Sequence, residues 1–184
     1  SGARCYRSQF LRCGVEGVAG LAQASPAVLR APVAEAGAAV AGLAHGAVVA
    51  RLAYLDGHTE SVSACAWSPD GTSLLSASGD MTLRLWDARS GECRLVLRGH
   101  EMGVNACAWS PDGASLLSAS SDKTLRLWDA RSGECRRMLH GHAQLVSACA
   151  WSPDGASLLS ASWDGTLRLW DASSGECRLV LRAR

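Results

Sequence analysis

The chain has 184 residues, of which 48% are hydrophobic and 19% charged, a balance typical of a soluble globular protein with room for one domain and an extension. Lys and Arg number 18 against 17 Asp and Glu. This near-neutral charge gives no reason to expect a nucleic acid or an anionic membrane as a partner, and we predict neither.

Residues 1–47 read as an N-terminal extension rich in Ala and Gly. Ser25-Pro26 is a helix-start signal and residues 34–44 are Ala-rich, so we expect some helical character, which Gly37 and Gly42 weaken. The first 24 residues faintly resemble a signal peptide, but Glu16 interrupts their apolar run. The stretch 33–50 holds Glu35 and is too weak for a membrane span, so we predict a soluble protein.

Residues 48–56 are expected to form a strand without partners in their own unit. Leu52, Tyr54 and Leu55 directly precede Gly57-His58, just as the apolar stretch 95–97 precedes Gly99-His100. The segment therefore looks like the last strand of a repeated unit whose earlier strands are absent from this sequence.

From residue 57 onward the chain repeats with a period of 42 residues. Gly-His, Ser-Pro-Asp-Gly and Trp-Asp each recur three times in register, and the first and third units share 35 of 42 residues. The units are 57–98, 99–140 and 141–184, and they follow one another directly.

Each unit predicts four short strands. In the first unit, residues 62–68 form a strand that ends at the Ser68-Pro69-Asp70-Gly71 turn, where Pro presets φ and Gly accepts a positive φ. Strands over 74–78, 82–86 and 93–97 follow, separated by tight turns at Gly79-Asp80 and Ser90-Gly91. The expected result is an antiparallel meander of four strands.

Together these motifs, at this period, resemble WD repeats over residues 57–182. The resemblance implies an all-β fold: a partial β-propeller in which each unit is one four-stranded antiparallel blade. Blade 1 would be 57–98, blade 2 99–140 and blade 3 141–184, with residues 48–56 as the orphan outer strand of a preceding blade.

The resemblance also implies a hydrogen-bond network inside each blade, in which an Asp bonds the Gly-His imidazole, the imidazole a strand hydroxyl, and the hydroxyl a Trp indole. Side-chain alternation leads us to choose Ser78 over Ser76 as the hydroxyl of blade 1. The expected members are His58, Ser78, Asp80 and Trp86; His100, Ser120, Asp122 and Trp128; and His142, Ser162, Asp164 and Trp170. Unpaired, such buried groups would be costly, so we interpret the network as structural.

Two chemical alternatives use the same residues. Ser, His and Asp in each blade could be taken for a catalytic triad, but a hydroxyl committed to an indole inside the blade cannot face a substrate. His140 and His142 could hold a metal, but His142 belongs to the network and His140 stands where the other units have Arg. We therefore expect no catalytic residue, no metal and no cofactor, and regard an enzyme with catalytic loops or a catalytic N-terminal segment as the rival interpretation.

The three units differ mainly at loop positions, namely the loop that enters the first strand and the turn between the second and third strands. In the family these loops lie on one propeller face, which commonly binds partners. We expect Trp163, in place of Gly79 and Ser121, to be the centre of a binding surface, unless its indole merely covers a neighbouring loop. The candidate partner-binding residues are Trp163, Leu145, Met102, Lys123, Glu101, Ser61 and Asn105.

Six of the eight cysteines recur at two positions of the repeat. Matching positions in successive units favour reduced, buried thiols in an intracellular protein, cytoplasmic or nuclear, over disulfides or a metal. The six are Cys65, Cys107 and Cys149, and Cys93, Cys135 and Cys177.

Three blades make an open wedge, whereas propellers close with four to eight blades. The uncovered end faces predict self-association, further blades or capping by the extension. The expected function is an intracellular protein-interaction scaffold, and two variants of this expectation are the sensor end of a larger signalling ATPase and a part of a multidomain signalling or assembly protein.

Overall fold

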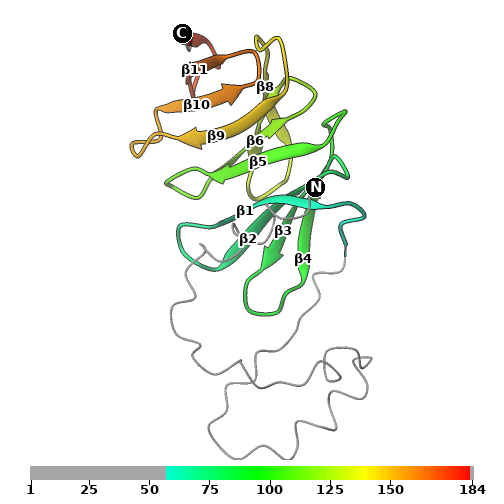
Figure 1. The fold of residues 1–184 in the computed structure, drawn as a ribbon. Coiled ribbons are helices and arrows are strands. Elements are labelled where there is room, and N and C mark those ends of the chain that lie inside the picture. The colour runs from blue at the N-terminus through cyan, green and yellow to red at the C-terminus, as the bar shows by residue number, and fades with distance from the viewer. Residues whose placement is uncertain (1–56, 183–184) are drawn as a thin grey trace, which may run out of the picture. The chain divides into compact units, whose positions relative to one another are not determined.

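The computed structural model describes residues 57–182. The extension expected over 1–47 and the strand expected over 48–56 lie outside these described residues. Twelve strands make three four-stranded antiparallel sheets, each with its strands in chain order (Figure 1). The strands are β1 (Val62–Trp67), β2 (Ser73–Ser78), β3 (Leu83–Asp87) and β4 (Cys93–Leu97); β5 (Val104–Trp109), β6 (Ser115–Ser120), β7 (Leu125–Asp129) and β8 (Cys135–Leu139); and β9 (Val146–Trp151), β10 (Ser157–Ser162), β11 (Thr166–Asp171) and β12 (Cys177–Arg182).

The expected fold class is confirmed for this part of the chain: the described residues are all-β, and each sheet is a meander of the kind that forms a propeller blade. The sheets are called blade 1 (β1–β4), blade 2 (β5–β8) and blade 3 (β9–β12). Figure 1 shows the first strands β1, β5 and β9 in succession, and β5 contacts both β1 and β9.

Two turn types set the strand register in every blade. Between β1 and β2, the amide of Gly71 donates to the carbonyl of Ser68 at 2.9 Å, and Gly71 has the positive φ of 69° that the sequence predicts. Between β2 and β3, the amide of Met81 donates to the Ser78 carbonyl at 3.3 Å, and here the positive φ falls on Met81 itself. This is a three-residue hairpin loop, one residue longer than the expected Gly79-Asp80 turn.

The core lies between blades. Leu75, Ala77, Leu83 and Leu97 of blade 1 pack against Val104, Leu116 and Trp128 of blade 2, and all seven are buried. The contact between blades 2 and 3 repeats this arrangement with the corresponding residues. Because a strand alternates its side chains between two faces, each sheet contributes one face to the blade before it and the other to the blade after it.

Candidate partner-binding face and the hydrogen-bond chain beneath it

A chain of three hydrogen bonds crosses the interior of blade 2. The indole N–H of Trp128 donates to the Ser118 hydroxyl at 2.9 Å, and this hydroxyl lies 2.7 Å from Nε2 of His100. Nδ1 of His100 lies 2.7 Å from a carboxylate oxygen of Asp122. Because an indole nitrogen only donates, the Ser118 hydroxyl accepts from it and donates to Nε2, and the Nδ1–H donates to Asp122.

Blades 1 and 3 repeat the chain with nearly the same distances. In blade 1 it runs from Trp86 through Ser76 and His58 to Asp80, with distances of 2.8, 2.7 and 2.8 Å. In blade 3 it runs from Trp170 through Ser160 and His142 to Asp164, with distances of 2.9, 2.8 and 2.8 Å. All three indoles are buried.

The prediction of the hydroxyl in this chain of hydrogen bonds is wrong. Ser76, Ser118 and Ser160 take the places predicted for Ser78, Ser120 and Ser162. Alternation cannot separate Ser76 from Ser78, because residues two apart in a strand share a face. The register decides: Trp86 pairs with Leu74, so Ser76 lies two residues along β2 from the position opposite the indole, whereas Ser78 lies four residues away. Ser78 instead accepts a hydrogen bond from the Asp80 amide at 3.1 Å and organises the β2–β3 turn.

The Asp residue at the end of the hydrogen-bond chain also bonds to the loops. One carboxylate oxygen of Asp122 accepts from the Thr124 amide and hydroxyl at 2.9 and 2.6 Å, and the other accepts from the Glu101 amide at 3.1 Å as well as from His100. Burial raises the pKa of Asp122, but the bonds from His100 and Thr124 outweigh it and hold the pKa well below its ordinary value. The carboxylate is therefore ionised, and it fastens the loop that enters β5 to the β6–β7 turn.

An arginine that the sequence analysis missed explains the glycine of the Gly-His motif. The guanidinium carbon of Arg126 lies 5.9 Å from the centroid of the Trp128 ring. A Cβ added at Gly99 would lie 2.5 Å from Nη1 of Arg126, and Gly99 has a positive φ of 153°. A side chain at Gly99 would therefore displace the arginine. Arg84 and Arg168 make the same contacts in the other blades, and the threefold Leu-Arg-Leu-Trp-Asp pattern was the available signal.

The loops that vary between units do share one end of the blades. In each blade, the first and second strands are antiparallel neighbours. The loop before the first strand and the turn after the second strand therefore lie at the same end of the sheet and meet there. The amide of Gly79 donates to the Ser61 carbonyl at 2.9 Å, that of Ser121 to Gly103 at 3.0 Å, and that of Trp163 to Leu145 at 3.1 Å. We call residues 59–61, 79–81, 101–103, 121–123, 143–145 and 163–165 the variable face.

Trp163 is the most exposed large hydrophobic side chain of the described residues, with 70% of its surface accessible. Its indole therefore does not fold down over a neighbouring loop, the alternative weighed from the sequence. Leu145, which accepts the backbone hydrogen bond from Trp163, is half-buried, and Met102 in the adjacent blade is exposed.

Met81 and Lys123 hold the variable face in a strained backbone conformation. Their φ values are 67° and 73°, in the left-handed region that ordinary residues avoid at a cost of roughly 1–2 kcal/mol. Gly165 fills the same position in blade 3 with a φ of 77°. Two of three blades thus keep a long side chain where glycine would fit without strain, and both side chains are exposed.

The remaining candidates divide into two groups. Glu101 and Ser61 are exposed on the variable face. Asn105 is not available there: its amide nitrogen donates to the Val146 carbonyl of blade 3 at 2.9 Å and to the Ser121 hydroxyl at 3.1 Å. Asn105 was predicted to bind a partner, and the structure corrects this, because its side chain is committed to the contact between blades.

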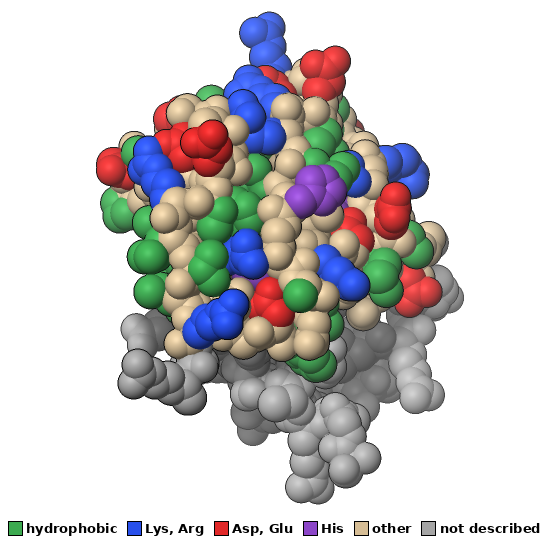
Figure 2. Space-filling view, turned by 90° about the horizontal axis from the view of Figure 1, so that it is seen from above, with side chains coloured by type: hydrophobic (Ala, Val, Ile, Leu, Met, Phe, Trp, Pro, Cys, Tyr) green, Lys and Arg blue, Asp and Glu red, His purple; other side chains and the backbone are tan. Residues whose placement is uncertain are grey.

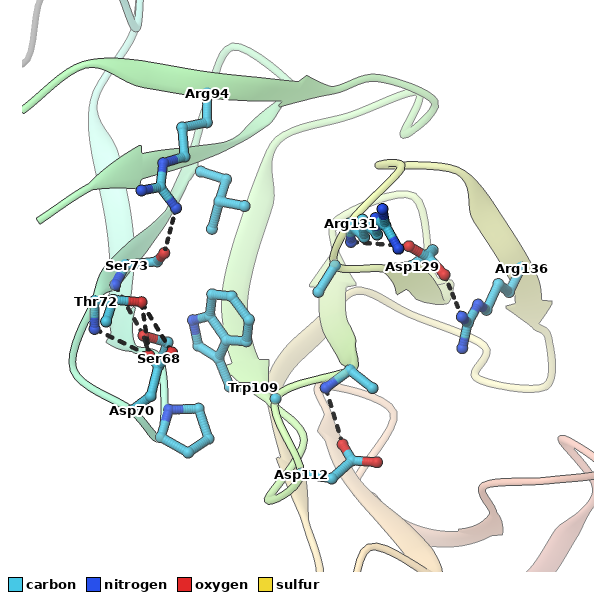
Figure 3. A pocket seen from close by; sticks show the side chains of 15 residues that line it. Ser68, Asp70, Thr72, Ser73, Arg94, Trp109, Asp112, Asp129, Arg131 and Arg136 are labelled. Atoms are coloured by element: carbon cyan, nitrogen blue, oxygen red, sulfur yellow. Dashed lines mark hydrogen bonds and ion pairs between the residues drawn. The ribbon is translucent and has the colours of Figure 1, made fainter.

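A groove of about 520 Å³ opens at the opposite ends of the strands, between the Ser-Pro-Asp-Gly turns of blades 1 and 2 (Figure 3). Figure 3 shows Trp109 between the Asp70 turn and the Asp112 turn. The carboxylate of Asp70 accepts from the Ser68 hydroxyl at 2.6 Å, and Arg136 pairs with Asp129. The indole N–H of Trp109 is buried without a partner. The carboxylates of the groove are thus already engaged, Asp70 and Asp112 by neighbouring serine hydroxyls and Asp129 by Arg136.

The cysteines were predicted to be buried, but of those described only Cys107 and Cys149 are half-buried, where they contact the preceding blade. Burial raises the pKa of Cys149 to about 12, and burial together with neighbouring thiols raises that of Cys107. Cys65 is exposed because it lies on the outer face of blade 1. Cys93, Cys135 and Cys177 are also exposed, which corrects the prediction for them: they begin the outermost strand of each blade. No disulfide joins the cysteines of residues 57–182.

Between residues 57 and 182 the chain forms no apolar helix of membrane-spanning length. Over the same residues, no three His, Cys, Asp or Glu side chains are grouped so that they could hold a metal ion.

Three successive four-stranded blades, each with its Asp-His-Ser-Trp chain, define the chain as a β-propeller repeat protein. It belongs to the WD40 family, described as WD domain, G-beta repeat, which matches residues 50–87, 91–129 and 133–171. Membership of this family implies a protein-interaction scaffold role, and the family is generally non-catalytic.

Individual relatives match over single repeats. The chain is 50% identical over 50 residues to THO complex subunit 3 of Arabidopsis thaliana, covering 27% of this chain and 16% of that protein. It is 56% identical over 39 residues to small ribosomal subunit protein RACK1 of Schizosaccharomyces pombe, covering 21% of this chain and 12% of that protein. The chain thus spans a small part of the curated relatives that it matches.

Among solved structures, the crystal structure of the RRP9 WD40 repeats superimposes with a TM-score of 0.68 at 28% identity. The superposition covers 70% of this chain and 41% of that one.

Proposed function

We propose that this chain is a protein-interaction scaffold whose variable face binds a protein partner around Trp163. The observation that carries the proposal is the exposure of Trp163, at 70%, on a frame that is otherwise repeated almost without change. Trp is the side chain most enriched at the energetic centres of protein interfaces, and an exposed indole on a rigid support loses little conformational freedom on binding.

Two further features support the same face. Met102 and Met81 are 52% and 46% exposed, which adds apolar surface, while Lys123 and Glu101 supply charge of both signs. The backbone strain at Met81 and Lys123 persists on this face, as strain does at functional sites. The names of two relatives, THO complex subunit 3 and small ribosomal subunit protein RACK1, assign them to larger assemblies, which fits a scaffold.

A catalytic triad made of the repeated Ser, His and Asp finds no support in the geometry. Ser118 has no exposed surface, and its hydroxyl is shared between Trp128 and His100. A nucleophile needs access to a substrate, and this hydroxyl has none. We extend the scaffold proposal to a cytoplasmic or nuclear location, because thiols that recur at matching repeat positions suit a reducing compartment.

The test is affinity capture with the 184-residue chain as bait, followed by mass spectrometry of the retained proteins. Trp163→Ala is compared with Met138→Ala, a 38% exposed apolar side chain on the outer strand β8, away from the variable face. We expect a set of proteins retained by the native chain and by Met138→Ala but reduced at least tenfold with Trp163→Ala, at an unchanged melting temperature. If the melting temperature falls by several degrees while capture is unchanged, the indole is a packing residue and the proposal is wrong.

A further inference from the structure

Two grooves open between blades at the strand ends that carry the Ser-Pro-Asp-Gly turns. The first groove, between blades 1 and 2, has a volume of about 520 Å³, and the second groove, between blades 2 and 3, has a volume of about 330 Å³. Each groove has a described blade on both sides. The repeat supplies nearly the same side chains to both grooves, and the difference between them accompanies two substitutions at the end nearer the fourth strands.

Turns of neighbouring blades meet at the two ends of each groove. At the inner end, toward the first strands, one Ser-Pro-Asp-Gly turn meets the next: a Cβ added at Gly113 would lie 3.8 Å from Cδ of Pro69. At the outer end, toward the fourth strands, the turn between the third and fourth strands meets the fourth strand of the preceding blade. Here a Cβ added at Gly133 would lie 3.6 Å from Leu95. Each groove therefore runs from the first strands to the fourth.

An arginine bridges the blades at the outer end of the second groove. Arg137 of β8 stands where blade 1 has Leu95. Its guanidinium donates to the carbonyls of Ser173 and Ser174 in blade 3 at 2.8 and 2.5 Å. The positive charge at this end is thus already satisfied by acceptors of the chain itself.

The first groove carries an arginine without an acceptor. Arg131 lines it from the β7–β8 turn, at the position that Ser173 occupies in blade 3, and is exposed. Its backbone amide donates to Asp129 at 2.8 Å, but its guanidinium makes no hydrogen bond or ion pair with residues 57–182. Leu95, in place of Arg137, leaves the outer end of this groove without a bridge between the blades.

The other charged groups that line the first groove have partners. Arg94 and Arg136 each pair with an aspartate of their own blade. Asp70 and Asp112 each accept from the serine hydroxyl of their own turn. Figure 3 shows Arg131 near the outer end, away from the Asp70 and Asp112 turns. Among the described residues that line this groove, Arg131 is therefore the charged group that still lacks a counter-ion.

Apolar surface lies next to this free guanidinium. Pro69 of blade 1 and Trp109 and Ala130 of blade 2 line the first groove, and Trp109 stands between the two Ser-Pro-Asp-Gly turns (Figure 3). The volume of the groove lies within the range of about 300–1,000 Å³ in which ligand pockets fall. The groove thus combines an apolar wall with one unpaired hydrogen-bond donor that carries a positive charge.

The charge of the chain as a whole does not select an acidic ligand. The formal net charge is +1, and on the face shown in Figure 2 the Lys and Arg side chains lie among Asp and Glu side chains. Recognition by Arg131 therefore depends on the local contact and not on long-range attraction. The group that matches a free guanidinium best is a carboxylate, because its two oxygens accept two parallel N–H bonds.

We propose that the first groove binds a segment of a partner protein in which an Asp or Glu lies next to an apolar side chain. The carboxylate pairs with Arg131, and the apolar side chain lies on Trp109. The second groove does not bind this segment, because Ser173 replaces the guanidinium and Arg137 bridges the outer end. Since the first groove lies at the opposite strand ends from the variable face, it does not depend on Trp163, and one chain can hold a partner on each face.

The test starts with a random-peptide phage library selected on the immobilised 184-residue chain. We expect the selected peptides to share an Asp or Glu next to an apolar residue. One such peptide is synthesised with a fluorescein label, and its affinity is measured by fluorescence anisotropy. Exchange of its acidic residue for the corresponding amide, Asn or Gln, should weaken binding at least tenfold, because the amide is neutral and cannot form the ion pair.

Arg131→Ser gives the first groove the side chain of the second. We expect it to weaken the acidic peptide at least tenfold and to abolish the preference over the amide peptide. Arg89→Ser is the matched control, because Arg89 is exposed at the same turn position of blade 1 and its loss changes the net charge equally, but it does not line the groove. Arg89→Ser and Trp163→Ala should each change the affinity less than twofold.

Leu95→Arg tests the location without touching Arg131. It introduces at the outer end of the first groove the arginine that bridges the second, so we expect at least a tenfold loss of peptide affinity. The melting temperature of each variant, compared with that of the native chain, shows that the blades remain folded. A folded Leu95→Arg chain that binds the peptide as tightly as the native chain would place the peptide outside the groove.

Three further results overturn the proposal. The first is a selection that yields no acidic peptides, and the second is an acidic peptide that Arg131→Ser binds as tightly as the native chain. The third is an equal loss in Arg89→Ser, which would indicate general attraction between charges. If Trp163→Ala alone weakens the peptide, the peptide binds the variable face, and the groove proposal fails while the proposed function stands.

Discussion

The indole of Trp128 and the hydroxyl of Ser118 are joined by a 2.9 Å hydrogen bond inside blade 2. Ser118→Ala removes the acceptor of a buried indole N–H and the donor to His100, and we expect the free energy of unfolding to fall by about 1–3 kcal/mol. Urea unfolding measures the change. Ser132→Ala, in an exposed turn, should shift it by less than about 0.5 kcal/mol. An equal effect of the two substitutions would contradict the structural role of Ser118.

His100→Ala breaks the same chain at its centre and should also cost about 1–3 kcal/mol. The two substitutions share partners, so the loss in the double variant Ser118→Ala/His100→Ala should be smaller than the sum of the single losses by at least about 0.5 kcal/mol. A double-mutant cycle in urea provides this number. Strict additivity would show that the bonds from Ser118 and from His100 act independently.

Acid should weaken the blades below about pH 5. The pKa values of Asp80, Asp122 and Asp164 are held below the ordinary 3.8 by hydrogen bonds that outweigh burial. Above about pH 5 these carboxylates are ionised in both the folded and the unfolded chain, and their stabilisation is complete. As the pH falls from about 5 through 3.8, the unfolded chain takes up protons first, so the free energy of unfolding decreases until the lower native pKa is reached.

The pH series is measured by urea unfolding between pH 6 and 2.5, comparing the native chain with Asp122→Asn. The variant lacks one of the shifted carboxylates, so its stability should be lower at pH 6 and should fall less steeply below about pH 5. Glu134→Gln, at an exposed turn, serves as the control and should follow the native curve. A parallel fall for Asp122→Asn would place the acid sensitivity elsewhere.

Lys123→Gly should stabilise the chain. The φ of 73° at Lys123 costs an ordinary residue roughly 1–2 kcal/mol, while the extra flexibility of glycine in the unfolded chain costs about 0.5–1 kcal/mol, so a gain of about 0.5–1 kcal/mol remains. The reciprocal change Gly165→Lys should lose a similar amount. Thermal unfolding of both variants checks the pair, and a loss of stability in Lys123→Gly would mean that the lysine side chain itself supports the turn.

The thiols should separate into two classes of reactivity. At pH 8, iodoacetamide should modify the exposed Cys135 and Cys177 much faster than Cys149, whose pKa burial raises to about 12. Peptide mapping by mass spectrometry after timed quenching resolves the sites. In urea all three should react at one rate, and rapid modification of Cys149 in the folded chain would contradict its position between blades 2 and 3.

The strands could be predicted closely because the repeat supplies the same local signals three times. Pro69, Gly71 and their counterparts fix the β1–β2 turn, and the apolar alternation fixes the strands around it. The predicted strand over 93–97 is β4 itself, and the others differ from the observed bounds by one residue.

Side-chain partners were less predictable, because they depend on register and on neighbours. Ser76 and Ser78 share a face, so only the pairing of β2 with β3 shows which of them reaches the indole. Cys93 lies in an apolar-looking strand, but that strand is the outer edge of its blade and leaves the thiol exposed. Asn105 varies between units like a binding residue, although it varies at a position that joins two blades.

The same apolar contact, repeated between successive blades, also bears on how such a chain can change in length. A further 42-residue unit inserted after His140 would meet, on either side, the surfaces that its own two faces already fit. Neither neighbour would need a substitution, because stability in such arrays is set by each unit and its nearest neighbours. Unequal recombination within the coding sequence could therefore add or remove whole blades while every intermediate still folds, and the loops of each new blade would be free to diverge.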